Sequence, residues 1–203
     1  MTGDAQPDSR EIDRGALARA DVYRLLGALL AGPPGAELVG MLRDITPDDA
    51  ESGAAMTSAW QALQAAAEQA APSGLEDEYF NLFIGLGRGE LVPYASFYIH
   101  GFLMEKVLAC LRDDLAVLGI TRSNGVAEPE DHAAAVCETM GMIITEHGLH
   151  LQQLAFFERY VDSWMGPFFD DLGKAEAAVF YRAVALLGQH FLEVERQYFS
   201  LPE

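Results

Sequence analysis

The chain has 203 residues, 50% hydrophobic and 22% charged, a composition typical of folded globular proteins and not of disordered ones. Its 31 acidic and 13 basic residues give a formal net charge of −18. Such a surface repels phosphates and anionic lipids, so we expect no binding of nucleic acid and no stable membrane association. It would attract a basic partner, although a role of the charge in solubility alone explains it equally well.

The N-terminal segment, residues 1–15, is polar and has no apolar run after a basic patch, so we expect a mobile tail and no secretory signal. The two cysteines, Cys110 and Cys137, form no CxxC motif, and each falls within an apolar helical pattern. We therefore expect two small buried thiols and no disulfide, in a reducing compartment. Together these features predict a cytoplasmic protein.

Helical periodicity dominates the first half of the chain. Apolar residues at i, i+3, i+4, i+7 and i+8 predict a first helix, which the Gly-Pro-Pro of residues 32–34 ends; they are Val22, Leu25, Leu26, Leu29 and Leu30. A second short helix is expected over 36–44, and an alanine-rich third over 54–71, closed by the Pro-Ser-Gly that begins at Pro72. A short aromatic helix over 75–84 then ends in a connector with three glycines.

The second half continues the helical pattern. A long helix is predicted after Ser96, and three more helices follow from later apolar series. Between the long helix and the three later ones, residues 119–128 (GITRSNGVAE) are polar, contain glycine and lack an apolar pattern, which is typical of a hinge. The apolar positions are Met104, Leu108, Leu111, Leu115 and Leu118; then Ala133, Val136, Cys137, Met140 and Ile144; then Leu154, Phe157, Val161, Trp164 and Phe168; and last Phe180, Val184, Leu187, Phe191, Val194 and Tyr198. The sequence thus predicts an all-α helical bundle with two lobes, 16–118 and 129–203, joined by this hinge.

Motifs for chemistry are few. The GLGRGE segment, residues 85–90, lacks GxGxxG spacing and follows a predicted helix instead of a strand, which favours a helix end with a flexible connector over a phosphate-binding loop. His147 and His150 have a spacing that could serve a metal, but no further histidine or cysteine lies nearby to complete a ligand set. No GxSxG motif or cysteine with a sequence-local base is present. We expect no metal, no cofactor and no catalytic site.

The EPEDH segment, residues 128–132, has two interpretations. As a helix start, Pro129 takes the first helical position, and the next two carboxylates, Glu130 and Asp131, favour the helix dipole from the first turn. That interpretation leaves Glu128 and His132 unexplained, because glutamate is not a preferred capping residue. From these residues alone, a helix start and a binding site are equally favoured.

Two segments carry a resemblance to a known family. The first, LFIGLGRGELVPYASFY (82–98), contains an LF-x-G part and a Pro-aromatic-x-S-x-aromatic part, and the second is EPEDH. In this order and spacing they resemble the TorD/DmsD family of redox-enzyme maturation chaperones. The C-terminal segments LxxLAFFERYVDSWMGPFF and FYRAVALLGQHFLEVE are similar to that family's closing helices. The resemblance spans most of residues 20–200.

Members of that family are all-helical and catalyse nothing. They bind the twin-arginine signal peptide and the body of a molybdopterin oxidoreductase precursor, of the DMSO/TMAO reductase or formate dehydrogenase type, and hold it back from export until its cofactor is inserted. The resemblance implies that the signal peptide is bound by the following residues: Tyr79, Leu82, Phe83, Pro93, Tyr94, Ser96, Tyr98, Glu128, Asp131 and His132. Relatives often have tryptophan where this chain has tyrosine at 79, 94 and 98, which implies a more polar groove and a different client.

The chemistry of such a ligand suits these residues. A twin-arginine signal presents basic residues followed by an apolar stretch, so it needs a groove of aromatic side chains and carboxylates at one end. The break at Pro93 keeps the aromatic residues around it out of an ordinary helix–helix contact. Glu128 and Asp131 would supply the charge for the arginines.

Two other functions stay open. A structural dimerisation or adaptor module without signal-peptide binding would also use exposed aromatic residues. A small helical hydrolase using His132 is less favoured, because adjacent residues on a helix point about 100° apart and Asp131 could not orient this histidine. Weak guanine-nucleotide binding is associated with some family members, but the chain has no phosphate-binding motif, so no nucleotide is predicted. The sequence is compatible with a monomer and with a domain-swapped homodimer.

Overall fold

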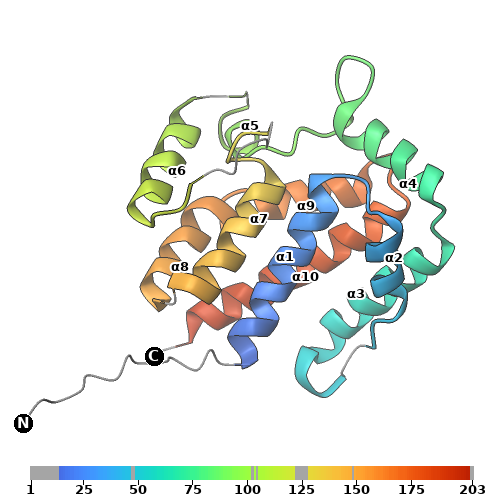
Figure 1. Ribbon diagram of the computed structural model, residues 1–203, viewed down its shortest axis with the longest axis horizontal. Coiled ribbons are helices and arrows are strands. Elements are labelled where there is room, and N and C mark those ends of the chain that lie inside the picture. The colour runs from blue at the N-terminus through green and yellow to red at the C-terminus, as the bar shows by residue number, and fades with distance from the viewer. Residues whose placement is uncertain are drawn as a thin grey trace, which may run out of the picture.

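The structure, a computed structural model, describes residues 14–46, 49–101, 103, 105–121, 128–147 and 149–201, and it describes no side chain for 49–52, 105 and 147. Helices account for most of these residues, and the only β-pairing in this part of the chain is one isolated bridge. The all-α prediction is therefore confirmed (Figure 1). The predicted tail lies outside the described residues, apart from Arg14 and Gly15, which begin the first helix.

The N-terminal helices follow the predicted pattern. They are α1 (Arg14–Ala31), α2 (Ala36–Arg43), α3 (Asp49–Gln69), α4 (Pro72–Tyr79) and a π-helical turn, η1 (Phe80–Ile84). Pro72 lies at the start of α4, because the N–H that proline lacks is not needed in the first helical turn. The turn η1 ends at Gly85, whose φ of 61° is a conformation that glycine adopts without steric cost.

The C-terminal half is more divided than the sequence predicts. Its elements are α5 (Ala95–His100), α6 (Glu105–Val117), α7 (Ala133–Met142), η2 (Ile143–His147), α8 (His150–Phe156), η3 (Phe157–Asp162), α9 (Met165–Lys174) and α10 (Phe180–Ser200). The helix predicted after Ser96 from this apolar series is found as α6, but it does not start directly after Ser96, because the left-handed Gly101 (φ 84°) first ends the separate short helix α5. The helix predicted through Leu154 and Phe168 is also interrupted, at Trp164, whose φ of −151° is not helical.

The helices on both sides of the predicted hinge share one core. Residues 122–127 of that hinge lie outside the described part of the chain. Before and after it, α1 packs along α7, and α10 packs along both α3 and α9 (Figure 1). The buried side chains of all these helices form one hydrophobic cluster. The division into two lobes stays a prediction, since the packing of the described helices shows no separation between the lobes at the predicted hinge.

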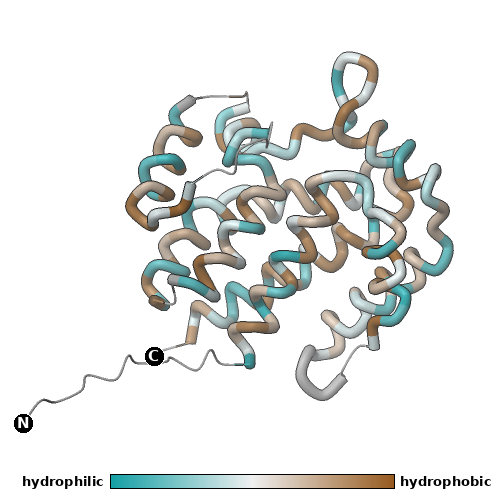
Figure 2. The backbone as a smooth tube through the Cα atoms, viewed as in Figure 1, coloured by the Kyte–Doolittle hydropathy of each residue, from teal (hydrophilic) through white to brown (hydrophobic). Residues whose placement is uncertain are grey.

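The core is rich in large aromatic side chains. The largest that are fully buried are Trp164, Tyr23, Tyr181, Phe168 and Phe169. Figure 2 shows hydrophobic and hydrophilic segments alternating along the helices, as expected where each helix buries one face. Among the described helices, none combines the length and the hydrophobicity that a membrane-spanning helix requires.

The two cysteines differ in burial. Both are free thiols, Cys137 is fully buried as predicted, and burial raises its pKa. The prediction for Cys110 is wrong, because this residue is exposed on α6. The apolar face of α6 is formed by Leu111 and Leu115, and Cys110 precedes Leu111 by one position, which turns it away from the core.

We expect Gly188→Ala to destabilise the fold. A Cβ atom on Gly188 of α10 would lie 2.4 to 2.5 Å from three ring atoms of Phe169 on α9, so the two helices would have to separate or the ring would have to move. Overpacking of this kind costs about 1–3 kcal/mol. Gly173→Ala is a matched control on α9, because its Cβ would meet that of Ala185 at 3.6 Å, an ordinary contact. Urea unfolding measures both variants, and equal stabilities would argue against this packing.

Candidate functional site

The two segments that the sequence singles out meet in space. Their backbones run antiparallel: the N–H of Ala95 donates to the carbonyl of Asp131 (2.9 Å), and the N–H of Ala133 donates to the carbonyl of Pro93 (2.8 Å). This short ladder fastens the start of α5 to the start of α7. Pro93 keeps the chain extended at this point, because proline cannot continue a helix.

Asp131 holds the start of α5. The residue is 2% exposed, and its Oδ2 accepts hydrogen bonds from the backbone N–H (3.1 Å) and the hydroxyl (2.6 Å) of Ser96. A carboxylate in this position satisfies N–H groups that the helix itself cannot pair. The carboxylate predicted to begin the following helix therefore caps a helix 35 positions earlier.

Of the two interpretations of EPEDH, the helix start with Pro129 in the first helical position is not observed. α7 begins only at Ala133, and the N–H of His132 donates to the carbonyl of Pro129 (3.1 Å), so the segment forms a turn before the helix. Glu130 accepts two hydrogen bonds from Arg112 of α6, at 2.8 and 3.0 Å. Proline followed by carboxylates suits such a turn as well as a first helical turn, which is why the sequence alone could not separate them.

His132 is the actual cap of α7. Its Nδ1 accepts a hydrogen bond from the N–H of Ala134 (3.2 Å), and its ring stands edge-on to the ring of Tyr94 with centroids 5.0 Å apart. Because the residue is only 5% exposed, burial lowers its pKa below the ordinary 6.5, while the charges of Glu128 and Asp131 oppose that shift. The cap requires the neutral imidazole.

We expect this cap to make stability depend on pH. The unfolded chain takes up a proton on His132 at a higher pH than the folded chain does. The contribution of the cap to the free energy of unfolding is therefore complete above about pH 6.5, and it is lost as pH falls through the lowered folded-state pKa. His132→Asn keeps a good capping residue and removes the titration. Urea unfolding at pH values on both sides of 6.5 should give a flatter profile for the variant. Parallel profiles for the two proteins would show that His132 does not cap as a neutral ring.

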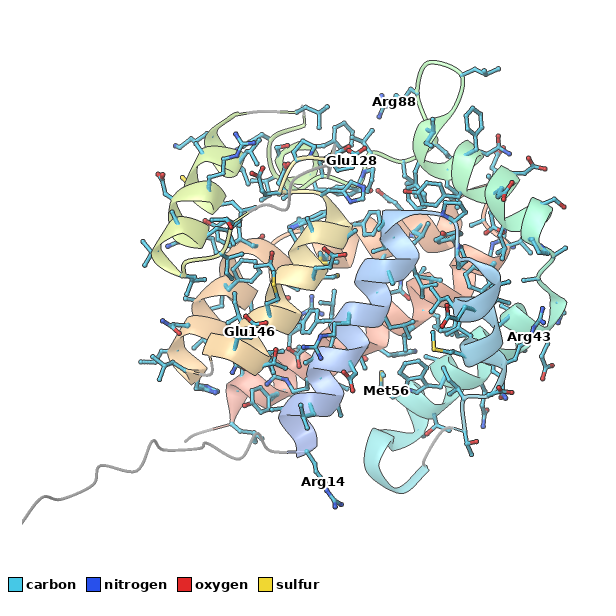
Figure 3. All side chains as sticks on the ribbon, in the orientation of Figure 1. Arg14, Arg43, Met56, Arg88, Glu128 and Glu146 are labelled. Atoms are coloured by element: carbon cyan, nitrogen blue, oxygen red, sulfur yellow. The ribbon has the colours of Figure 1, made fainter. Side chains whose placement is uncertain are left out.

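Glu128 and Tyr94 form the exposed part of the site. The Tyr94 hydroxyl donates a hydrogen bond to the Glu128 carboxylate, and burial followed by this bond raises the pKa of Tyr94. Burial and the charge of Glu128 also raise the pKa of Tyr79 on α4. Glu128 itself is exposed and lies on the same side of the molecule as Arg88 (Figure 3). The site therefore presents a solvent-accessible carboxylate beside aromatic rings.

A cluster of aromatic rings extends the site toward α4 and α10. Tyr79 and Phe83 have ring centroids 4.9 Å apart, and both lie against Tyr181, at 6.1 and 5.4 Å. The hydroxyls of Tyr79 and Tyr181 donate to the carbonyls of Leu30 (3.2 Å) and Leu29 (2.8 Å) at the end of α1. Tyr79 and Phe83 stay half-buried, so part of each remains open to solvent.

The other predicted site residues contribute in different ways. Leu82 is 0% exposed, and Pro93 is buried, so both shape the site from beneath. Tyr98 is half-buried against α9: its hydroxyl donates to Asp171 (3.1 Å), and its ring centroid lies 5.6 Å from that of Trp164. Burial and the charge of Asp171 raise the pKa of Tyr98. Tyr79, Phe83, Tyr94 and Glu128 are thus the predicted residues that combine proximity with exposure.

The glycine-rich loop after η1 adds residues that sequence reasoning missed. It protrudes beyond α4 (Figure 1), and Leu86 within it is 98% exposed. The guanidinium of Arg88 lies 5.3 Å from the centroid of the Phe97 ring, which ties the loop to α5 by a cation–π contact. Two apolar residues flanking a glycine, Ile84 and Leu86, were the available signal for an apolar loop tip.

Two glutamates in the α4 and loop region were also missed. The Glu78 carboxylate accepts hydrogen bonds from the N–H groups of Val179, Phe180 and Tyr181, at 2.7, 3.1 and 2.8 Å, and so caps α10. Glu90 accepts from the N–H groups of Glu176 and Ala177 at 2.6 and 3.1 Å. These carboxylates fix the site's aromatic segment against α10. No local signal marks them, because their partners lie more than 80 residues away.

Of the two histidines whose spacing could serve a metal, only the ring of His150 is described. No group of three or more metal-ligating side chains occurs within the residues that the structure describes. The side chain of His147 is not described, and the ring of His150 lies against Tyr198 and Phe199 of α10, with centroids 5.6 and 5.5 Å away.

Comparisons with known proteins converge on one group. Residues 49–170 match the family described as nitrate reductase delta subunit. The chain is 24% identical over 197 residues to the chaperone protein TorD of Shewanella loihica, which covers 88% of this chain and 91% of that protein. It is 28% identical over 127 residues, 62% of each chain, to a Haemophilus influenzae protein described as a Tat proofreading chaperone, DmsD. A solved structure from Archaeoglobus fulgidus, described as a candidate redox enzyme maturation protein, has the same fold, with a TM-score of 0.56, 18% identity and coverage of 86% of this chain and 93% of that one.

Proposed function

The chain belongs to the nitrate reductase delta subunit family, whose matched relatives are named as chaperones and not as enzymes, and we propose that it is a chaperone for a molybdopterin oxidoreductase precursor. In this proposal it works in the cytoplasm, binds the twin-arginine signal peptide and the body of the precursor, and assists cofactor insertion before export. Two relatives named as chaperones, one of them for Tat proofreading, support this proposal, as does the likeness in fold to a protein described as acting in redox enzyme maturation. The signal peptide, the cofactor step and the compartment are our additions.

The exposed Glu128 carboxylate beside half-buried aromatic rings is the observation that carries the proposal. An arginine side chain needs a carboxylate that water can still reach in the free protein, and Glu128 is exposed while Asp131 is 2% exposed and bonded to Ser96. The apolar residues of a signal would lie over Tyr79, Phe83 and Tyr94. We therefore assign arginine binding to Glu128, and we assign Asp131 to positioning the segment that carries Tyr94.

The geometry disfavours the hydrolase alternative. A general base needs to reach a substrate, but His132 is 5% exposed and its Nδ1 is engaged with the N–H of Ala134. Burial lowers the pKa of His132, and no nucleophilic side chain among the described residues donates to its ring. A buried cap explains this histidine fully.

Affinity purification from the native host tests the proposal. The tagged chain should recover the precursor of a molybdenum-containing oxidoreductase with its signal peptide still attached, identified by mass spectrometry of the N-terminal fragment. The Glu128→Gln, Tyr94→Ala double variant is the matched control and should recover less of it. Recovery of only mature enzyme, or of no redox enzyme, would refute the proposed function.

A further inference from the structure

Phe97 is an aromatic residue of α5 that the packing of the core does not account for. It is half-buried, yet it does not pack against the hydrophobic cluster of the described residues, whereas its neighbour Tyr98 does. The two rings meet edge-on, with centroids 5.7 Å apart. Within the described part of the chain, the charged group that lies against the Phe97 ring is the guanidinium of Arg88, 5.3 Å from its centroid. The distinctive partner of this ring is therefore a guanidinium.

The glycine-rich loop after η1 sets Arg88 in this position. A Cβ atom on Gly89 would lie 2.5 to 2.8 Å from three backbone atoms of η1, and one on Gly85 would collide with the backbone carbonyl of Arg88. Glycine avoids both collisions, so the loop can follow a tight path that returns the chain toward η1. That path directs the Arg88 side chain toward α5.

The contact that Arg88 makes is easily exchanged. Its side chain is exposed and, among the described residues, forms no hydrogen bond and no ion pair, although the chain has 31 acidic residues. A cation–π contact at an exposed position is a weak interaction. The guanidinium of a bound peptide can therefore replace Arg88 on the ring at small cost.

The Phe97 ring belongs to the same part of the site as the exposed carboxylate. Phe97 follows Tyr94 by three positions, and its N–H donates to the Tyr94 carbonyl (3.1 Å), so both side chains lie on one side of the first turn of α5. The Tyr94 hydroxyl donates to Glu128, and Figure 3 shows Glu128 and Arg88 on the same side of the molecule. This side of the protein therefore has both a carboxylate and a ring face that accepts a guanidinium.

We propose that the Phe97 ring binds one arginine of the twin-arginine pair, that Glu128 binds the other, and that Arg88 occupies the Phe97 ring until the peptide displaces it. This inference rests on the proposed function and assigns the second arginine within it. Arginine suits the ring better than lysine, because its planar guanidinium stacks on an aromatic face and is more weakly hydrated than an ammonium group.

Calorimetric titration with a twin-arginine signal peptide tests the exchange. We expect Arg88→Gln to raise the affinity about two- to five-fold, because the peptide no longer competes with an internal guanidinium. Lys106→Gln is the matched control, since it removes the same charge at an exposed position of α6. Its effect should vanish at high salt, where that of Arg88→Gln should persist. Equal affinities of the two variants at high salt, or a lowered affinity of Arg88→Gln, would overturn the proposal.

Single replacements in the peptide test the ring itself. Exchanging each arginine for lysine in turn should weaken binding to the wild-type chain. We expect Phe97→Leu to remove the loss caused by one of these exchanges and to leave the loss caused by the other, which depends on Glu128. Phe97→Tyr keeps an aromatic ring and should behave as the wild type, and Tm shows that both variants fold. Unchanged losses in Phe97→Leu would overturn the proposal.

The same titrations separate this inference from the proposed function. Binding of the peptide that neither Arg88→Gln nor Phe97→Leu changes would refute the assignment of the second arginine and leave the proposed function standing. Absence of binding to the wild-type chain and to Arg88→Gln alike would refute the proposed function, and this inference with it.

Discussion

Glu195→Ala is expected to destabilise the protein by about 3–5 kcal/mol, because it leaves a buried guanidinium without its counter-charge. Glu195 on α10 is 0% exposed and forms a two-pronged pair with Arg19 of α1, at 2.5 and 2.9 Å. The Tyr23 hydroxyl donates to the same carboxylate at 2.9 Å, and Arg19 also donates to Gln153 (3.1 Å). The substitution would therefore disturb α1, α8 and α10 together.

Urea unfolding measures this cost against two further variants. Glu193→Ala removes a carboxylate two positions away on the same helix, where it is exposed, and should change stability by less than about 0.5–1 kcal/mol. The double variant Arg19→Met, Glu195→Leu replaces the pair with apolar side chains and should recover most of the loss. If Glu195→Ala cost no more than Glu193→Ala, the pair would not be buried as the structure shows.

Glu128→Gln is expected to weaken binding of a twin-arginine peptide by about 2–5 kcal/mol, which is roughly 30-fold or more. Glutamine keeps the size of the side chain and can still accept a hydrogen bond from Tyr94, so the local fold should persist. Glutamine lacks the negative charge that pairs with a guanidinium group. In the complex, the bound peptide would shield that charge from water.

Calorimetric titration at several salt concentrations checks this prediction. Asp113→Asn is the matched control, because it makes the same change in net charge at an exposed position of α6. The control should lower affinity slightly and only at low salt, where long-range attraction is not screened. If both variants bound the peptide equally, Glu128 would contribute only to the general acidity of the surface.

The bundle could be predicted from sequence because amphipathic periodicity is a local property. The apolar series of α7 predicts both the helix and its buried face, whereas Val194 and Tyr198 at the end of the α10 series are exposed. The breaks were less predictable. At Gly101 a single glycine in the left-handed region ends α5, although the apolar residues on either side fit one continuous helical pattern.

The sequence indicated the two segments that meet in the structure, but not the contacts between them. The motifs contain both Tyr94 and His132, but only the fold shows that their backbones pair. Likewise, only the fold shows that the Asp131 carboxylate accepts a hydrogen bond from Ser96. Hydrogen bonds between residues 35 positions apart leave no periodic trace in the sequence. The same is true of the Arg19–Glu195 pair, whose members are 176 positions apart.

Isothermal titration of the chain with signal peptides from the molybdoenzyme precursors of its host tests the central claim most directly. The account predicts saturable binding of at least one twin-arginine peptide, intermediate affinity for its twin-lysine form and weak binding of its twin-alanine form. The intermediate value is expected because lysine keeps the charge but loses the two-pronged geometry of guanidinium. Equal affinities for all three forms, or no binding to any peptide or intact precursor, would contradict the account.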